Sequence, residues 1–458
     1  MHHQQVDLLR RLVIGVVLAT AFAPLAWSTT DAALALEKYV AQPDPNLMWR
    51  EATSGRLGKA EYVEYVLTSQ TWRGIEWKHQ LFILRPANMQ PDVKQALLFV
   101  HGGRWKPEYE EARRATDLPR EAILFARLAE KIGAPVAVLR QVPFAPIFER
   151  REDALIAYTF DQYLRSGESD WPLLLPMVKS SVRAMDAVQA IVRERWGVAI
   201  DSFTVTGASK RGWTSWLTAA VDPRVKAIAP MVIDVLNMQA QLAHQRETWG
   251  DVSEKIDDYS ALDLPTKLTT ERGRDLLAIV DPYSYRNRLT QSKFILLSTN
   301  DRYWPLDALK LYWTGLPDPK HVLYVPNQGH NLRDIDRVIG ALAAVHRYSS
   351  TQQPLPTLSW TASAARSLGF TVAADRPPER VSIWTANSST RDFRDARWTS
   401  HACQRSSSGY DCVAERAKRG YTAAFAEAAF VDEQQLAFSL STTVCIAGPE
   451  MTAPEDRC

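Results

Sequence analysis

The sequence contains little cysteine and almost no net charge, and each of these shortages argues against one class of protein. Only 4 cysteines occur among 458 residues, which is too few for a chain held together mainly by disulfides. The 54 basic and 52 acidic side chains leave a formal net charge of +2. No stretch concentrates Lys or Arg with interleaved aromatics, so the sequence gives a nucleic-acid partner no electrostatic support. Hydrophobic residues at 46% and charged residues at 23% are typical of a globular protein.

Motifs for the common cofactors and metals are also missing. The segment 55–59 (GRLGK) lacks the spacing of a phosphate-binding loop, and there is neither an HExxH motif nor a dinucleotide fingerprint after a strand. The cysteines form no CxxC pair, which disfavours zinc. We therefore expect no cofactor and no metal site.

A single long apolar run occurs, and it lies at the N-terminus. Arg10 and Arg11 precede the apolar stretch 12–27, and polar residues follow. This pattern predicts a secretory signal peptide over residues 1–28. An uncleaved membrane anchor is the alternative, but the run is short for a span and contains Pro24. We expect a periplasmic or secreted protein with no membrane span after signal removal.

All four cysteines lie near the C-terminus, and an even number in an exported chain predicts two disulfides. The pairs expected are Cys403–Cys412 and Cys445–Cys458, because the nearest pairings close short loops.

Apolar runs alternate with helical patterns between residues 35 and 351. Buried strands are predicted at 95–100, 135–139, 202–206, 225–233, 293–298 and 322–325, after two antiparallel edge strands at 61–68 and 76–84. Helices are predicted at 121–132, 174–196, 210–220 and 331–347, whereas residues 34–60 are expected to form a helical or irregular lead-in. This alternation predicts a mostly parallel sheet with flanking helices. The stretch of about 234–288 is a long insertion of the kind that forms a lid, and residues 355–458 have the short alternating segments of a small β-sandwich.

The segment 202–213 (SFTVTGASKRGW) has the pattern of a strand, a sharp turn and a helix. Ser209 in this turn is the candidate nucleophile, because such an elbow exposes a serine hydroxyl at the edge of the sheet. The usual second glycine, two residues after the serine, is replaced by Arg211, and Gly212 follows it. An ordinary serine at a helix N-terminus is the alternative interpretation.

The fold predicted by this elbow places its acid and its base later in the chain, in that order. Asp301 follows the strand at 293–298, and His330 follows the strand at 322–325, so both are expected at the carboxyl edge of the sheet. Asp301 is the preferred acid and His330 the base. Asp234 is the second choice of acid, and Asp307 is expected to be a solvent-facing residue near a helix start.

A glycine-rich turn follows the buried strand at 95–100. Gly102 and Gly103 match a loop whose backbone N–H groups bind an oxyanion, and the backbone N–H of Lys210 would be the second donor. The ammonium of Lys210 has two interpretations, a group that binds an anionic substrate or a solvated side chain.

Four segments together give the sequence a family resemblance. They are GASKRGWTSW around Ser209, TNDRYWPLD around Asp301, NQGHN around His330, and the hairpin TWRGIEWKHQLFILRP. The sequence resembles the PhoPQ-activated pathogenicity-related (PqaA-type) family over roughly residues 35–450. That resemblance implies an exported bacterial protein with an α/β-hydrolase-like fold and no settled substrate. The basic residue Lys210 after the serine and Gly212 three residues after it give this segment a local resemblance to glucuronoyl esterases.

These observations predict an exported serine hydrolase that cleaves an ester or amide through an acyl-enzyme. Its substrate is expected to be a small molecule, a glycan ester or a peptide. A prolyl-oligopeptidase-like peptidase is the alternative among enzymes. A hydrolase fold used as a non-catalytic secreted binding or signalling protein is the alternative from another class.

Overall fold

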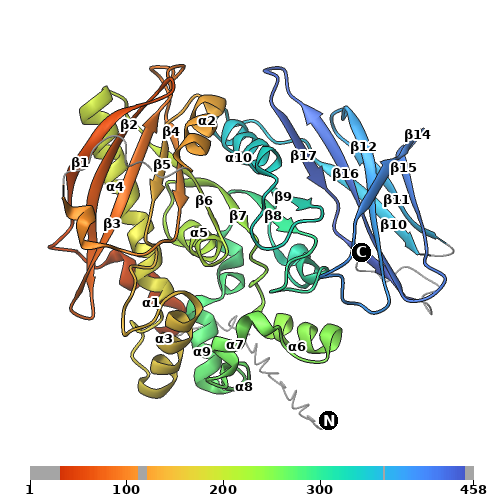
Figure 1. Cartoon of the computed structure of the whole chain (residues 1–458), viewed down its shortest axis with the longest axis horizontal. Coiled ribbons are helices and arrows are strands. Elements are labelled where there is room, and N and C mark those ends of the chain that lie inside the picture. Colours follow the sequence, from red (N-terminus) through yellow and green to blue (C-terminus); the bar gives the residue numbers. More distant parts are fainter. Residues whose placement is uncertain (1–30, 112–120, 365–366, 449–458) are drawn as a thin grey trace, which may run out of the picture.

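The computed structural model describes residues 31–111, 121–364 and 367–448 (Figure 1). Its central sheet has the strand order β1-β2-β3-β5-β4-β6-β7-β8-β9. The strands are β1 (Met48–Leu57), β2 (Ala60–Trp72), β3 (Ile75–Arg85), β4 (Gln95–Val100), β5 (Val136–Leu139), β6 (Ser202–Ala208), β7 (Val225–Met231), β8 (Ser292–Ser298) and β9 (Lys320–Val325). The strands from β5 to β9 pair in parallel, and β1, β2 and β3 pair antiparallel at one edge. This is the predicted α/β-hydrolase fold.

Helices cover both faces of the sheet because its parallel strands are apolar on both sides. One face packs against α1 (Asp31–Ala41), α4 (Leu174–Trp196) and α5 (Lys210–Val221), and α3 (Glu152–Ser166) lies beside them. The other face packs against α2 (Ala122–Ile132) and α10 (Ile335–Ser350). The two faces form separate buried clusters, and the parallel strands contribute alternating side chains to each.

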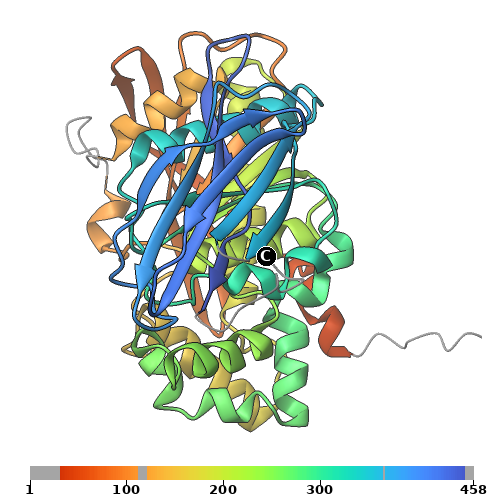
Figure 2. The same ribbon diagram turned by 90° about the vertical axis from the view of Figure 1, so that its right-hand side faces the viewer.

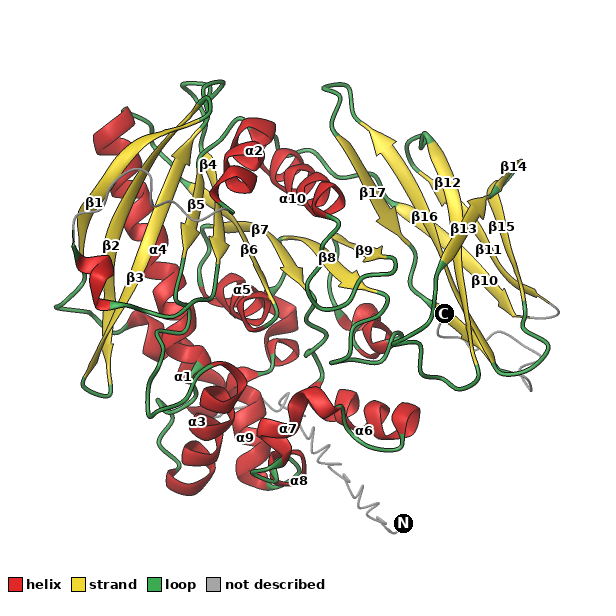
Figure 3. Ribbon diagram, viewed as in Figure 1, coloured by secondary structure: helices red, strands yellow, loops and turns green. Residues whose placement is uncertain are grey.

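The predicted insertion leaves the sheet after β7 and returns at β8. It folds into α6 (Met238–Trp249), α7 (Asp257–Ser260), α8 (Leu264–Lys267) and α9 (Glu271–Val280), with short 3-10 turns before α7 and after α9. Figure 3 shows these helices gathered below the carboxyl ends of the parallel strands. The insertion therefore lies at the edge where the candidate catalytic residues were expected.

The C-terminal part is a β-sandwich, as predicted (Figure 2). Its strands are β10 (Leu358–Ala364), β11 (Ser367–Ala374), β12 (Arg380–Ser388), β13 (Thr399–Ala402), β14 (Gln404–Ser406), β15 (Gly409–Glu415), β16 (Tyr421–Val431), β17 (Ala437–Ser441) and β18 (Cys445–Ala447). One layer has the order β10-β11-β15-β14, and the other contains β17, β16, β12 and β13. The second layer continues the central sheet, because Ser441 of β17 pairs with Val322 of β9. The proposed boundary near residues 351–355 thus separates two parts that share a sheet.

The structure departs from the prediction at β1 and α3 in the hydrolase-like part. The lead-in contains β1, an edge strand whose residues are mostly exposed or half-buried, so it lacks the apolar run that marks a buried strand. Helix α3 was not predicted, although its first residues lie beside the candidate site.

One of the two predicted disulfides is present, Cys403–Cys412, with 4.5 Å between the Cα atoms. The other predicted pair includes Cys458, and the predicted signal peptide covers residues 1–28; both lie outside the described residues. Within the described ranges, no helix is long and apolar enough to cross a membrane.

Candidate active site

Ser209 lies in the sharp turn between β6 and α5. Its backbone has φ 56° and ψ −127°, a conformation that L-residues rarely adopt. The turn is held on both sides, because Ser209 N–H donates to Met231 O at 2.8 Å and Trp213 N–H donates to Ser209 O at 3.0 Å. Such strain is typical of a nucleophile elbow and not of an ordinary helix cap.

Gly212 explains why the elbow tolerates Arg211 at the position of the usual glycine. A Cβ on Gly212 would lie 2.7 Å from Ile233 Cγ2 and 2.9 Å from Gly207 O, so α5 passes the strands closely only with glycine there. The close approach falls three residues after Ser209. The position two residues after it is free to carry a long side chain.

Asp301 and His330 meet at the carboxyl edge of the sheet. His330 Nδ1 lies 2.9 Å from Asp301 Oδ2, and Asp301 Oδ1 accepts a hydrogen bond from Tyr303 N–H at 2.9 Å. The Asp301 side chain is 8% exposed, and that of His330 is 25% exposed. The aspartate is thus fixed through both oxygens, and it leaves Nε2 of the imidazole available for another partner.

The ring of Tyr303 lies over the imidazole of His330, with 4.3 Å between the centroids and 32° between the planes. Burial raises the pKa of Tyr303 to about 12, and the charges of Asp153 and Asp301 add to the shift. Tyr303 is therefore neutral at physiological pH and contributes stacking and hydrogen bonding without charge. Sequence reasoning missed it, although it lies only two residues after Asp301.

The C-terminal part holds the two loops that carry Asp301 and His330. Asn300 Nδ2 donates to Ala396 O at 2.7 Å. Asn327 exchanges two hydrogen bonds with the backbone of Trp398, at 2.8 and 3.0 Å. The segment between β12 and β13 thus supports both loops, which gives the sandwich a structural part in the site.

Ser209 and His330 line the same cavity, which has an empty volume of about 690 Å³ including its open mouth. Its other polar lining comes from Asp153 and Lys210. The remaining wall is apolar or aromatic: Phe160, Trp213, Ile233, Val235, Met238, Leu242, Ile256, Tyr259, Leu264, Pro265, Leu268, Tyr303 and Trp304. Much of this wall comes from the insertion, so the insertion shapes the space beside the candidate nucleophile.

The predicted oxyanion loop follows β4 directly. Gly103 has a φ of 127°, in the region that favours glycine, and Gly102 O accepts a hydrogen bond from Gln141 N–H at 3.2 Å. Lys210 is the first residue of α5, and the N–H of a first helical residue has no partner within its helix. These are the residues from which two backbone donors were expected.

One interpretation of the sequence was that the ammonium of Lys210 is solvated, and this is wrong. Lys210 is 7% exposed, and its Nζ lies 2.9 Å from Asp153 Oδ2 and 3.3 Å from Glu152 Oε2. Arg211 forms a bidentate pair with Glu152 at 2.6 and 2.8 Å. Both basic side chains of the elbow are therefore neutralised by the start of α3.

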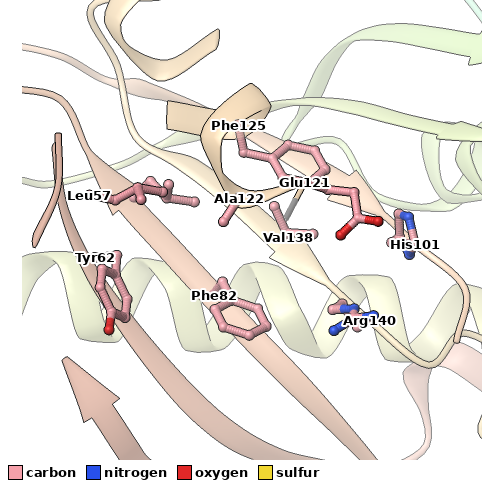
Figure 4. Close-up of a pocket in the computed structure, with 10 residues that line it drawn as sticks. Leu57, Tyr62, Phe82, His101, Glu121, Ala122, Phe125, Val138 and Arg140 are labelled. Carbon is pink, nitrogen blue, oxygen red and sulfur yellow. The ribbon is translucent and has the colours of Figure 1, made fainter. Parts of the chain in front are cut away.

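Figure 4 shows a second cavity, between α2 and strands β3 and β5, with an empty volume of about 450 Å³. Apolar side chains form most of its lining, with His101, Glu121 and Arg140 at one end. Burial, opposed by the hydrogen bond with Gly102 O, lowers the pKa of His101. The side chain of His101 lines this second cavity, whereas His330 lines the cavity that contains Ser209.

Asp234, the second choice of acid, does not contact His330. It accepts a hydrogen bond from the Tyr312 hydroxyl at 2.5 Å. Burial raises the pKa of Asp234 to about 7, against the effect of that hydrogen bond. Asp234 and Asp301 both line a small polar cavity behind the site, but only Asp301 is paired with the imidazole.

The expectation that Asp307 faces solvent is wrong. The residue is 5% exposed, and its carboxylate contacts His244 at 2.6 Å, Lys310 at 2.6 Å and Arg391 at 3.1 Å. Burial by itself raises the pKa of Asp307, but the hydrogen bond from His244 and the charge of Lys310 outweigh it and hold the pKa well below its usual range. His244 and Arg391 lie more than sixty residues away from Asp307 in the sequence, so no local pattern at a helix start reveals them.

Residues 36–394 match the family described as PhoPQ-activated pathogenicity-related protein. The chain belongs to this family. It is 33% identical over 389 residues to the autocrine proliferation repressor protein A of Dictyostelium discoideum, covering 78% of this chain and 76% of that protein.

Solved structures similar to this one include an esterase and a hydrolase. Acetyl xylan esterase 1 from Thermoanaerobacterium is 15% identical with a TM-score of 0.46, covering 69% of this chain and 94% of the esterase. An S-formylglutathione hydrolase from Agrobacterium tumefaciens is 10% identical with a TM-score of 0.45, covering 67% and 100% respectively.

The family match ends inside the segment between β12 and β13 that supports the loops of Asp301 and His330. It therefore includes the first three strands of the sandwich as well as the hydrolase-like sheet. Other contributors to the site had no signal in the sequence. Asp153 and Glu152 begin a helix that was not predicted, and their pairing with Lys210 and Arg211 spans more than fifty residues.

Proposed function

We propose that this chain is an exported serine hydrolase that cleaves an ester or amide through an acyl-enzyme. Ser209 is the proposed nucleophile, His330 the base and Asp301 the acid that orients it. The observation that carries the proposal is the 2.9 Å contact between Asp301 and His330, with His330 and Ser209 on the wall of one cavity. A strained serine, an imidazole with a fixed acid and a shared cavity are what acyl transfer requires.

In the proposed reaction, Ser209 Oγ bonds to the substrate carbonyl carbon while its proton passes to His330 Nε2. The resulting oxyanion accepts hydrogen bonds from the backbone N–H groups of Gly103 and Lys210. His330 then gives the proton to the leaving oxygen or nitrogen, whose bond to carbon breaks. Water repeats the sequence on the acyl-enzyme and releases the acid, and the serine recovers its proton.

Export is proposed on two observations. The N-terminal sequence has the pattern of a signal peptide, and the Cys403–Cys412 disulfide is typical of an oxidising compartment. These two observations support a periplasmic or secreted protein.

A secreted signalling protein is the second candidate. It is favoured by the name of the Dictyostelium relative, an autocrine proliferation repressor protein. A protein of this kind could keep the hydrolase fold without turnover.

Hydrolysis by the purified chain separates the two candidates. A panel of nitrophenyl esters and peptide amides would be tested with the parent and with His330→Ala. The proposal expects turnover by the parent and a loss of about a thousandfold or more in the variant, because proton transfer is lost. No turnover of any substrate by the parent would contradict the proposal and favour the signalling candidate.

A further inference from the structure

The cavity beside Ser209 combines a large apolar wall with a balanced set of charges. Resting on the proposed function, we propose that its substrates are esters of uncharged, apolar acyl groups longer than acetyl, and that Asp153 enforces the exclusion of acyl groups that carry a carboxylate. The proposal names a substrate class and a specificity-determining residue for the proposed reaction.

The apolar wall gives the first argument. Leu242 is 9% exposed, Leu264 is 1% exposed and Leu268 is 5% exposed, and all three line the cavity from the insertion. Three polar lining residues, Ser209, Lys210 and His330, belong to the proposed reacting end. Asp153 is paired with Lys210, and the only other hydroxyls of the described lining are carried by the aromatic rings of Tyr259 and Tyr303. An acyl chain that extends from the serine therefore contacts carbon atoms and removes apolar surface from water.

The charge balance gives the second argument. The cavity is lined by one cation, Lys210, and by Asp153, which binds it at 2.9 Å with side chains 9% and 15% exposed. Glu152 next to them is shared between Lys210 and the bidentate pair with Arg211. A carboxylate on the acyl group would enter an apolar space in which the cation is already paired, and burying it there is costly.

Asp153 also receives a hydrogen bond from the hydroxyl of Tyr259 on α7, at 3.0 Å. It therefore joins the insertion to the residue that follows the nucleophile. Replacing it with asparagine leaves two cations, Lys210 and Arg211, to share Glu152. One positive charge then becomes available to the cavity.

The first experiment measures kcat/KM for nitrophenyl acetate, butyrate, hexanoate and octanoate, and for the nitrophenyl hemiester of succinic acid. In the parent, kcat/KM is expected to rise about fourfold for each added methylene until the wall is filled. The succinyl ester has four acyl carbons, as butyrate does, and is expected to react at least about tenfold more slowly.

The variants test the assignment residue by residue. Leu242→Trp is expected to lower the octanoate-to-acetate ratio, whereas Ala243→Trp, on an exposed neighbour in the same helix, leaves that ratio as in the parent. Asp153→Asn is expected to raise the succinyl-to-butyryl ratio about tenfold. Tyr259→Phe removes the same hydrogen bond from the insertion but keeps the charge pair, so it does not raise that ratio. Thermal melts exclude unfolded variants.

Labelling by a fluorophosphonate separates failure of this inference from failure of the proposed function. A parent that is labelled and hydrolyses acetate or the succinyl ester best would overturn the substrate class and leave the hydrolase intact. A ratio unmoved by Asp153→Asn would overturn the role of that residue. A parent that is neither labelled nor active would overturn both proposals together.

Discussion

Replacing Asp301 with asparagine changes one atom at the centre of the proposed triad, and the structure fixes how the new side chain must lie. Tyr303 N–H already donates to Oδ1 at 2.9 Å and needs an acceptor, so the amide oxygen of asparagine takes that position. The amide nitrogen then faces His330 Nδ1, where Oδ2 stood. It donates its hydrogen to Nδ1, which moves the imidazole proton to Nε2.

An imidazole that carries its proton on Nε2 cannot accept the proton of Ser209. The expected loss in kcat is about ten-thousandfold, which is the cost of the wrong tautomer in a serine triad. Stability changes little, by about 1 kcal/mol or less, because the hydrogen bond to Tyr303 survives and the volume is the same.

The assay is hydrolysis of a reactive nitrophenyl ester by Asp301→Asn and Asp234→Asn beside the parent, with thermal melts. Asp234 is the matched control, since it is also buried at this edge but is bonded to Tyr312 and not to His330. Asp234→Asn is expected to keep turnover within about tenfold of the parent, as expected for a residue without a part in proton transfer. Equal losses in the two variants would refute the assignment of Asp301 as the acid.

Asp307→Asn is expected to destabilise the fold by about 3–5 kcal/mol, because it breaks a buried ion-pair network. In the parent, the stabilisation from this network is present above the ordinary aspartate pKa and is lost as pH falls toward the depressed pKa of Asp307. Thermal melts from pH 7 down to pH 2 would show this loss. The pH dependence of stability has the opposite sign at Asp234. Its pKa is raised to about 7, so the folded state keeps a proton that the unfolded state releases near pH 4. Asp234→Asn should therefore stabilise the fold more at pH 8 than at pH 5, by up to about 4 kcal/mol, and raise the melting temperature more at pH 8. Peptide mapping without reduction is expected to find Cys445 joined to Cys458, and free thiols there would contradict this pairing.

Much of the hydrolase-like sheet was predictable from the sequence because its strands are buried on both faces. The run 95–100 and the helical pattern 174–196 match β4 and α4 residue for residue. The edge strand β1 has no such run, since most of its residues are exposed or half-buried. Continuity of the sandwich with the central sheet depends on one pairing between β9 and β17, which no local pattern encodes.

The candidate triad was predictable from its order and from the position of each residue after a buried strand. What the sequence did not predict is the environment of these residues. The start of α3 neutralises Lys210, Tyr303 stacks on His330, and Asp307 is buried among charges. Each of these three environments depends on side chains brought together by the tertiary fold. The sequence showed only that Tyr303 lies two residues after Asp301, and not that its ring stacks on His330.

Site-mapped labelling by a fluorophosphonate tests the central claim most directly. The parent chain and Ser209→Ala would be treated side by side, digested and analysed by mass spectrometry, with melts to show that both are folded. We predict a single phosphonylated peptide that contains Ser209 in the parent and no adduct in the variant. An adduct on another residue, or the same labelling in both proteins, would contradict it.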